Sequence, residues 1–146
     1  MRILFINGPN LNLLGERERS IYGATTLEQI NDRIRDRARE MGADVVFFQS
    51  NHEGEIVERI QKTKGQFDVL VINPAGFTHT SVAIRDALLA VDIPTIEVHL
   101  SNPAKREAFR RRSLISDVAI GTISGFGEES YHLAFQAAVD LGGKKK

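Results

Sequence analysis

The sequence predicts an α/β fold with helices on both faces of a parallel sheet, and two patterns lead to that prediction. Short runs that are nearly continuous in Val, Ile, Leu and Phe are typical of strands buried on both faces. Amphipathic stretches separate these runs, and strands that alternate with helices form a parallel sheet. The 146 residues fit a single domain over residues 1–146, which is long enough to bury about two-thirds of its unfolded surface.

Five apolar runs are the expected strands. With helices between them they make a three-layer sandwich, for which we favour the flavodoxin-like strand order 2-1-3-4-5. The runs are residues 3–7, 44–50, 68–75, 94–100 and 118–125.

Four amphipathic stretches are the expected helices. Thr25 and Thr26 are candidate N-caps of the first. Glu28 or Gln29 would complete a capping box, and Gly42 would end the helix. Its apolar stripe, at spacings of three and four, is Leu27, Ile30, Ile34, Ala38 and Met41. The other expected helices are about residues 53–64, 81–91 and 129–141.

Composition excludes several classes of function. Lys and Arg number 19, as do Asp and Glu, so a balanced charge predicts no nucleic-acid or anionic-membrane partner. The sequence holds no cysteine, which excludes disulfides and thiol catalysis. No apolar run has membrane-spanning length and MRILFI is too short for a signal peptide, so we expect a cytoplasmic protein. The basic tail, residues 142–146, is expected to be frayed.

Polar residues gather where the expected strands end. In an open parallel sheet, ligands bind outside the carboxyl ends of the strands, so a site is expected there. The connection at about residues 8–24 is too long for an ordinary loop, and we interpret it as a lid. The polar segments are NGPNLN (7–12), QSNHEG (49–54), NPAGFTHTS (73–81) and EVHLSN (97–102).

Glu97 and His99 lie two apart on an expected strand, so their side chains share a face. A carboxylate there can fix the imidazole tautomer and prepare it to donate a proton, although an ordinary polar pair fits the same spacing. His79 suits either the site or a capping, solvated position. These three residues could imitate a two-His-one-carboxylate metal site. We expect no metal, since the carboxylate and imidazole would bond each other.

Tyr22 follows Arg17 and Arg19 closely in GERERSIYG. A phenol has a pKa of about 10, and a cation within roughly 4–6 Å favours its ionised form. Tyr22 beside Arg17 is therefore a candidate base on a closing lid, while packing is the alternative.

Arg106 and Arg110 are four apart and would share a helix face, as an oxyanion or phenolate clamp or as a solvated basic face. Backbone N–H groups at Leu100 and Ser101 could form a carboxylate-sized nest, with Asn10 nearby.

Six motifs occur in series over essentially the whole chain, and together they resemble type II 3-dehydroquinate dehydratase. The motifs are NGPNLN, LGxRE followed by YG, QSNxEG, NPAGFTHTSxAxRDA, EVHLSN and REAFRxxS. The resemblance implies a hydro-lyase of the shikimate pathway, at the third step toward chorismate and the aromatic amino acids. It would remove water from 3-dehydroquinate by anti elimination through an enolate, with no metal, cofactor or Schiff base.

The resemblance also implies roles for individual residues. Tyr22 matches the base and Arg17 the lid arginine that keeps it ionised. His99 matches the general acid, Glu97 its orienting partner, and Asn10 the residue that holds a water at the enolate oxygen. The residues matching substrate-binding positions are Asn73, His79, Leu100, Ser101, Arg110 and Arg106, the last lying near the tyrosine.

Assembly follows from the same resemblance. Asp86 matches a residue that reaches a neighbouring subunit's site, in a homododecamer of four trimers. Arg19 stands where the family often has Pro, and Ser130 where it often has Gly.

The alternative is a non-catalytic flavodoxin-like binding or signalling domain. A receiver domain, one kind of signalling domain, would need acidic residues at the strand ends, and here those ends carry Asn7 and Asn73. A flavin or nucleotide binder would need a hydroxyl-rich phosphate loop, which NGPNLN lacks.

Overall fold

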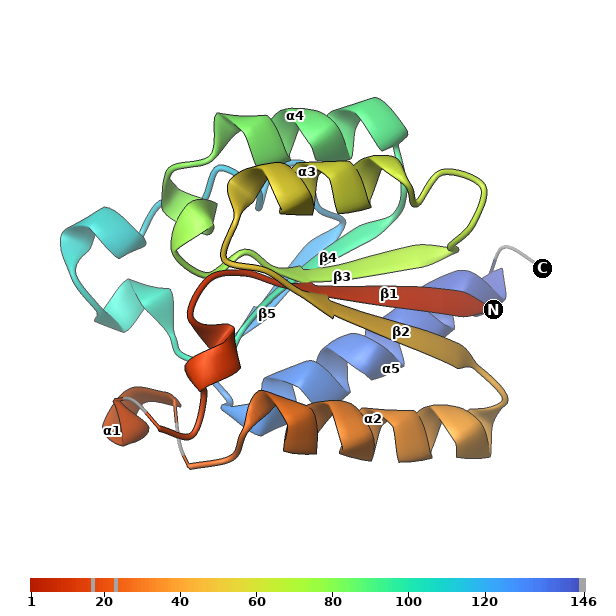
Figure 1. Cartoon of the computed structure of the whole chain (residues 1–146), viewed down its shortest axis with the longest axis horizontal. Coiled ribbons are helices and arrows are strands. Elements are labelled where there is room, and N and C mark those ends of the chain that lie inside the picture. The colour runs from red at the N-terminus through yellow and green to blue at the C-terminus, as the bar shows by residue number, and fades with distance from the viewer. Residues whose placement is uncertain (17, 23, 145–146) are drawn as a thin grey trace.

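In the computed structural model the described residues are 1–16, 18–22 and 24–144, without the side chains of Arg19 and Tyr22. Their five strands form one parallel sheet in the order β2-β1-β3-β4-β5, which confirms the expected order (Figure 1). The strands are β1 (Arg2–Asn7), β2 (Asp44–Gln49), β3 (Val69–Asn73), β4 (Thr95–His99) and β5 (Gly121–Ser124).

Helices cover both faces of the sheet (Figure 1). One apolar core lies between the sheet and the helices α2 (Leu27–Met41) and α5 (Glu128–Lys144). It includes the side chains of β1, β3 and β4 that face these two helices. The other lies under α3 (Glu53–Gln61) and α4 (Val82–Val91). The sheet is therefore the central of three layers, and the helices that cover its faces leave the strand ends available for a ligand site.

Helix α2 begins and ends where its sequence predicts. The Thr26 side chain accepts from the Gln29 backbone N–H, while the Gln29 side chain accepts from the Thr26 N–H. Gly42 ends the helix at φ 69°, a left-handed conformation that favours glycine. Met41 is 44% exposed, so its inclusion in the buried stripe was wrong. It lies in the last turn, beyond the part that packs on the sheet.

The basic tail differs from expectation. Residues 142–144 belong to α5 instead of fraying, while Lys145 and Lys146 lie outside the described residues. Gly142 is buried, and a Cβ there would lie 2.6 Å from the Met1 sulfur. Its missing side chain thus lets the last turn of α5 pack against the start of the chain.

The segment of Arg106 and Arg110 is not the helix that their spacing suggested. It consists of two short 3-10 turns, η3 (Pro103–Lys105) and η4 (Ala108–Arg110). Arg106 lies between them in extended conformation and interrupts any continuous helix. The shared helix face was therefore a wrong prediction, although both side chains reach the same cavity.

The expected lid segment is anchored at its start. Turn η1 (Leu11–Leu13) and the residue after it place Leu11 and Leu14 in the core, and α1 (Arg19–Tyr22) follows. Arg17 and Gly23 are outside the described residues. No described helix combines the length and apolar character needed to cross a membrane.

Candidate active site

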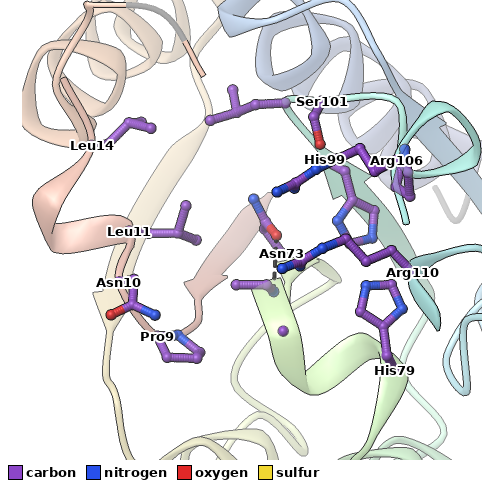
Figure 2. A pocket seen from close by; sticks show the side chains of 14 residues that line it. Pro9, Asn10, Leu11, Leu14, Asn73, His79, His99, Ser101, Arg106 and Arg110 are labelled. Atoms are coloured by element: carbon purple, nitrogen blue, oxygen red, sulfur yellow. Dashed lines mark hydrogen bonds between the residues drawn. The ribbon is translucent and has the colours of Figure 1, made fainter. Parts of the chain in front are cut away.

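A cavity of about 160 Å³ opens at the carboxyl ends of β1, β3 and β4 (Figure 2). Parallel strands bring their ends to one edge of the sheet, which is why segments far apart in sequence meet there. Eight residues proposed from sequence line it together: Asn10, Asn73, His79, His99, Leu100, Ser101, Arg106 and Arg110.

Of the other four proposed residues, the structure places Glu97 and Asp86 outside the lining of this cavity. Glu97 is buried behind His99 and lines an adjoining cavity. Asp86 is exposed on α4 and is not among the residues that line either cavity. Arg17 lies outside the described residues, and for Tyr22 the description covers the backbone in α1 and not the phenol.

Gly8 brings two of the site's loops together. Its N–H donates to the Asn73 carbonyl over 2.8 Å, and a Cβ at Gly8 would lie 2.4 Å from the Pro74 carbonyl oxygen. No side chain fits in that space, so the loop after β1 can approach the loop after β3 because residue 8 is glycine.

The Glu97 and His99 side chains form the hydrogen bond that their spacing predicted. His99 Nε2 lies 2.5 Å from Glu97 Oε2, and the Glu97 side chain is 1% exposed. An ionised carboxylate can only accept, so Nε2 carries the hydrogen. Nδ1 is then the ring nitrogen of His99 that can exchange a proton with the cavity (Figure 2).

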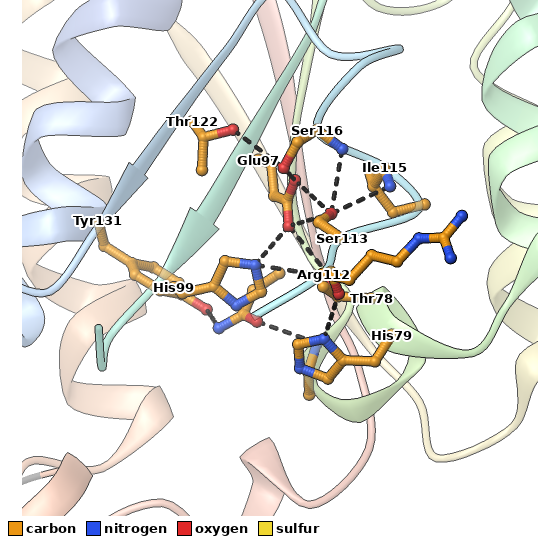
Figure 3. Close-up of polar contacts among 12 residues, drawn as sticks. Thr78, His79, Glu97, His99, Arg112, Ser113, Ile115, Ser116, Thr122 and Tyr131 are labelled. Carbon is orange, nitrogen blue, oxygen red and sulfur yellow. Dashed lines mark hydrogen bonds and ion pairs between the residues drawn. The ribbon is translucent and has the colours of Figure 1, made fainter. Parts of the chain in front are cut away.

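Three hydroxyl groups that sequence reasoning missed also converge on Glu97 (Figure 3). Thr78 donates to Oε2 over 3.1 Å, Ser116 donates to Oε1 over 2.6 Å, and Ser113 donates to both oxygens. Ser113 belongs to the REAFRxxS motif, but nothing in the sequence indicates its contact with β4.

Burial alone would raise the pKa of the Glu97 carboxyl. The hydrogen bonds from His99, Ser116 and Ser113, together with the charge of His99, outweigh burial and hold that pKa below its ordinary value. The carboxylate is therefore ionised at neutral pH.

A second buried group, also missed, supports Asn73. Asn73 Nδ2 donates to the Tyr131 hydroxyl over 2.9 Å, and that hydroxyl donates to Asn7 Oδ1. The Ala75 N–H occupies Asn73 Oδ1, so the amide is held in one orientation. Burial raises the pKa of the Tyr131 phenol, although the Asn73 hydrogen bond opposes this, and the phenol is neutral.

His79 is held by the backbone opposite it. Its Nδ1 lies 2.7 Å from the Arg112 carbonyl oxygen, which can only accept, so Nδ1 carries a hydrogen. Neither capping nor full solvation describes this position. Among the described residues, no three His, Cys, Asp or Glu gather in the manner of a metal site.

Two arginines give the cavity positive charge. Arg106 reaches Glu18 of the expected lid, with 3.7 Å between Nη2 and Oε2. Arg110 pairs with Glu107 and lies over the Phe109 ring. Guanidinium groups in a polar cavity suit a small anionic or hydroxylated ligand.

Polar and basic side chains around an oriented histidine, at the carboxyl edge of a parallel sheet, define a site for acid–base chemistry on a small molecule. Residues 1–139 match the family model described as class II dehydroquinase. The chain belongs to this family.

Similar proteins support the same assignment. A 3-dehydroquinate dehydratase of Hahella chejuensis is 58% identical over 137 residues, covering 93% of each chain. The catabolic 3-dehydroquinase 1 of Fusarium vanettenii is 55% identical over 137 residues, covering 94% of this chain and 95% of that one. The crystal structure of type II dehydroquinase from Butyrivibrio crossotus has a TM-score of 0.93 at 45% identity, covering 95% of this chain and 97% of that one.

Proposed function

We propose that this chain is a hydro-lyase that dehydrates 3-dehydroquinate to 3-dehydroshikimate. The family match over residues 1–139 carries this proposal. The site agrees with it, because the reaction must remove a proton next to a ketone, hold negative charge on oxygen and release hydroxide as water. These steps need a base, an oxyanion stabiliser and an acid.

His99 is the acid in this proposal. The fixed Nε2–H bond to Glu97 leaves Nδ1 to protonate the departing hydroxyl, and the ionised carboxylate stabilises the imidazolium beforehand. Glu97 does not line the cavity proposed for substrate, so it acts through the His99 imidazole.

Tyr22 is the proposed base, and Arg17 is proposed to keep its phenol ionised. Both assignments depend on the LGxRE and YG motifs. Asn10 is at the rim of the cavity, with its N–H on Asn51 Oδ1, and we assign to it the water that stabilises the enolate. Arg106 contacts the same lid through Glu18 and adds positive charge there.

The remaining lining residues are proposed to hold the substrate. The loop of Leu100 and Ser101 follows β4 directly and would take the carboxylate through backbone N–H groups. Asn73, His79 and Arg110 would take ring hydroxyls from the opposite wall.

We also propose assembly into a dodecamer of four trimers. Asp86 is exposed and does not line its own chain's cavity, as expected for a residue that acts in a neighbouring site. Val82 and Leu89 are 57% and 55% exposed on the same helix, one turn to either side. An apolar face around a carboxylate suits burial against another subunit.

Absorbance of the conjugated enone product tests the activity directly. Dehydration should proceed near neutral pH, unaffected by chelators or by borohydride added with substrate. Tyr22→Phe should abolish most of the rate, and wild-type activity in that variant would refute the assignment of the base. Mass measurement of Asp86→Ala should show weakened subunit association, or the assay should show a lost rate. If the variant keeps both wild-type association and the wild-type rate, the proposed assembly role is refuted.

A further inference from the structure

The loop after η4 places two serine hydroxyls on the carboxylate behind the proposed acid (Figure 3). Ser113 Oγ accepts the backbone N–H groups of Ile115 and Ser116, each over 3.0 Å. A hydroxyl has two lone pairs and one hydrogen, so after these bonds the hydrogen is what remains. It points to Glu97, at 3.0 Å from Oε1 and 3.1 Å from Oε2.

The surroundings of Glu97 present donors to both of its oxygens. Ser116 lies at 2.6 Å from Oε1, while Thr78 and His99 lie at 3.1 and 2.5 Å from Oε2. A protonated carboxyl accepts fewer hydrogen bonds than a carboxylate, and it cannot donate to Ser113 Oγ, which already accepts two N–H groups. The donor arrangement therefore selects the ionised form.

We propose that Ser113 and Ser116 are positioning residues for the general acid. Their hydroxyls hold the Glu97 carboxylate ionised and fixed in its plane, which keeps the hydrogen of His99 on Nε2. The serines act through the carboxylate, because neither lines the cavity proposed for substrate. The link to catalysis rests on the proposed dehydratase function, whereas the control of Glu97 ionisation does not.

The charged groups around Glu97 agree with this role. The titratable or cationic side chains that line the adjoining cavity with Glu97 are His79 from η2 (Ala75–His79), His99 from β4, and Arg110 and Arg111 from the η4 segment. No second carboxylate is among the described residues that line it. Burial is the largest influence on the pKa of this carboxyl and opposes ionisation, whereas the bonds from His99, Ser116 and Ser113 favour it, so loss of the serine donors should raise that pKa.

Carbon-13 NMR titration of the Glu97 carboxyl tests the proposal without substrate, with Glu97→Gln used to assign the signal. In Ser116→Ala, and more so in Ser113→Ala/Ser116→Ala, the Glu97 midpoint should move upward by about one pH unit or more, a roughly tenfold change in protonation. Ser116→Thr keeps the hydroxyl and should restore the wild-type midpoint. If the double variant does not fold, Ser116→Ala alone decides, because its backbone bond to Ser113 survives.

Ser50→Ala is the matched control. Ser50 Oγ accepts the His52 N–H over 2.9 Å and donates to Glu55 over 2.5 Å, so it repeats the local pattern on a carboxylate outside the site. This variant should leave the Glu97 midpoint unchanged.

Kinetics supply the second readout. Ser116→Ala should lower kcat most toward acidic pH, where the raised Glu97 midpoint leaves less carboxylate behind His99, and should change KM by less than about twofold, since no direct substrate contact is removed. A wild-type Glu97 midpoint in folded Ser116→Ala would overturn the proposal. An inactive wild-type protein would instead refute the dehydratase function and leave the titration to judge the serines.

Discussion

The polar cluster around Glu97 carries a charge, whereas the polar cluster around Tyr131 is neutral, although both lie at the carboxyl ends of adjacent strands. Glu97 accepts from four side chains. Tyr131 links Asn7 and Asn73 through one hydroxyl, and Asn7 Nδ2 is among the described buried atoms that have no partner. A buried charge without hydrogen-bond donors costs much more free energy than a buried neutral amide that lacks one hydrogen bond.

The difference in charge corresponds to a difference in task. The Glu97 cluster sets the protonation state of His99, which the proposed chemistry requires. The Tyr131 cluster sets the orientation of Asn73, so that one N–H of its amide remains for the cavity. One cluster should therefore be tested mainly through rate, the other mainly through stability and KM.

The largest expected effect comes from Glu97→Gln. The amide keeps the shape but places N–H groups against hydroxyl donors and removes the charge that stabilises the His99 imidazolium. We expect kcat to fall about 10²–10⁴-fold, the range that general acid catalysis contributes. Steady-state kinetics would measure this, and a fall of less than about threefold would remove the charged cluster from the mechanism.

Tyr131→Phe should mainly cost stability. It leaves Asn7 Oδ1 and Asn73 Nδ2 without the hydroxyl in a fully buried place, which costs about 1–3 kcal/mol of unfolding free energy. Urea unfolding would measure the loss. We expect KM to rise more than kcat falls, because Asn73 loses its fixed orientation; an unchanged KM would separate Tyr131 from the binding wall.

The two clusters should lose their contributions to stability at opposite ends of the pH range. The folded-state pKa of Glu97 is lowered, so its contribution is present above the ordinary value of 4.5 and is lost as pH falls. The pKa of Tyr131 is raised, so its contribution is present below 10.0 and is lost as pH rises beyond it. Unfolding free energy measured against pH should fall less steeply than in the wild type on the acidic side for Glu97→Gln and on the alkaline side for Tyr131→Phe. Equal effects on both sides would contradict the comparison.

Thr122→Val should have the smallest effect. Its hydroxyl reaches Ser116 Oγ at 3.5 Å and does not touch Glu97, so it lies outside the set of direct donors. We expect a change within about 0.5 kcal/mol in unfolding free energy and little change in kcat. A loss as large as that of Ser116→Ala would extend the charged cluster by one residue.

The fold could be predicted from particular local patterns. The apolar runs gave all five strands, and the capping box at Thr26 with Gly42 gave both ends of α2. These features depend on neighbours within a few residues, so sequence alone carries them. The spacing of Arg106 and Arg110 failed as a helix because Arg106 is extended and divides the segment into two turns.

By itself the sequence determined which five segments form strands, the Glu97–His99 pairing and the motifs that indicated the family. Only the tertiary structure decided that Ser113 and Ser116 bond a carboxylate on β4, and that Tyr131 bonds Asn7, 124 residues away. The physical reason is that spacing two apart on one strand fixes a shared face, whereas contacts between distant segments depend on how helices and loops pack across the sheet. Hydroxyl groups that act through such packing leave no local pattern to read.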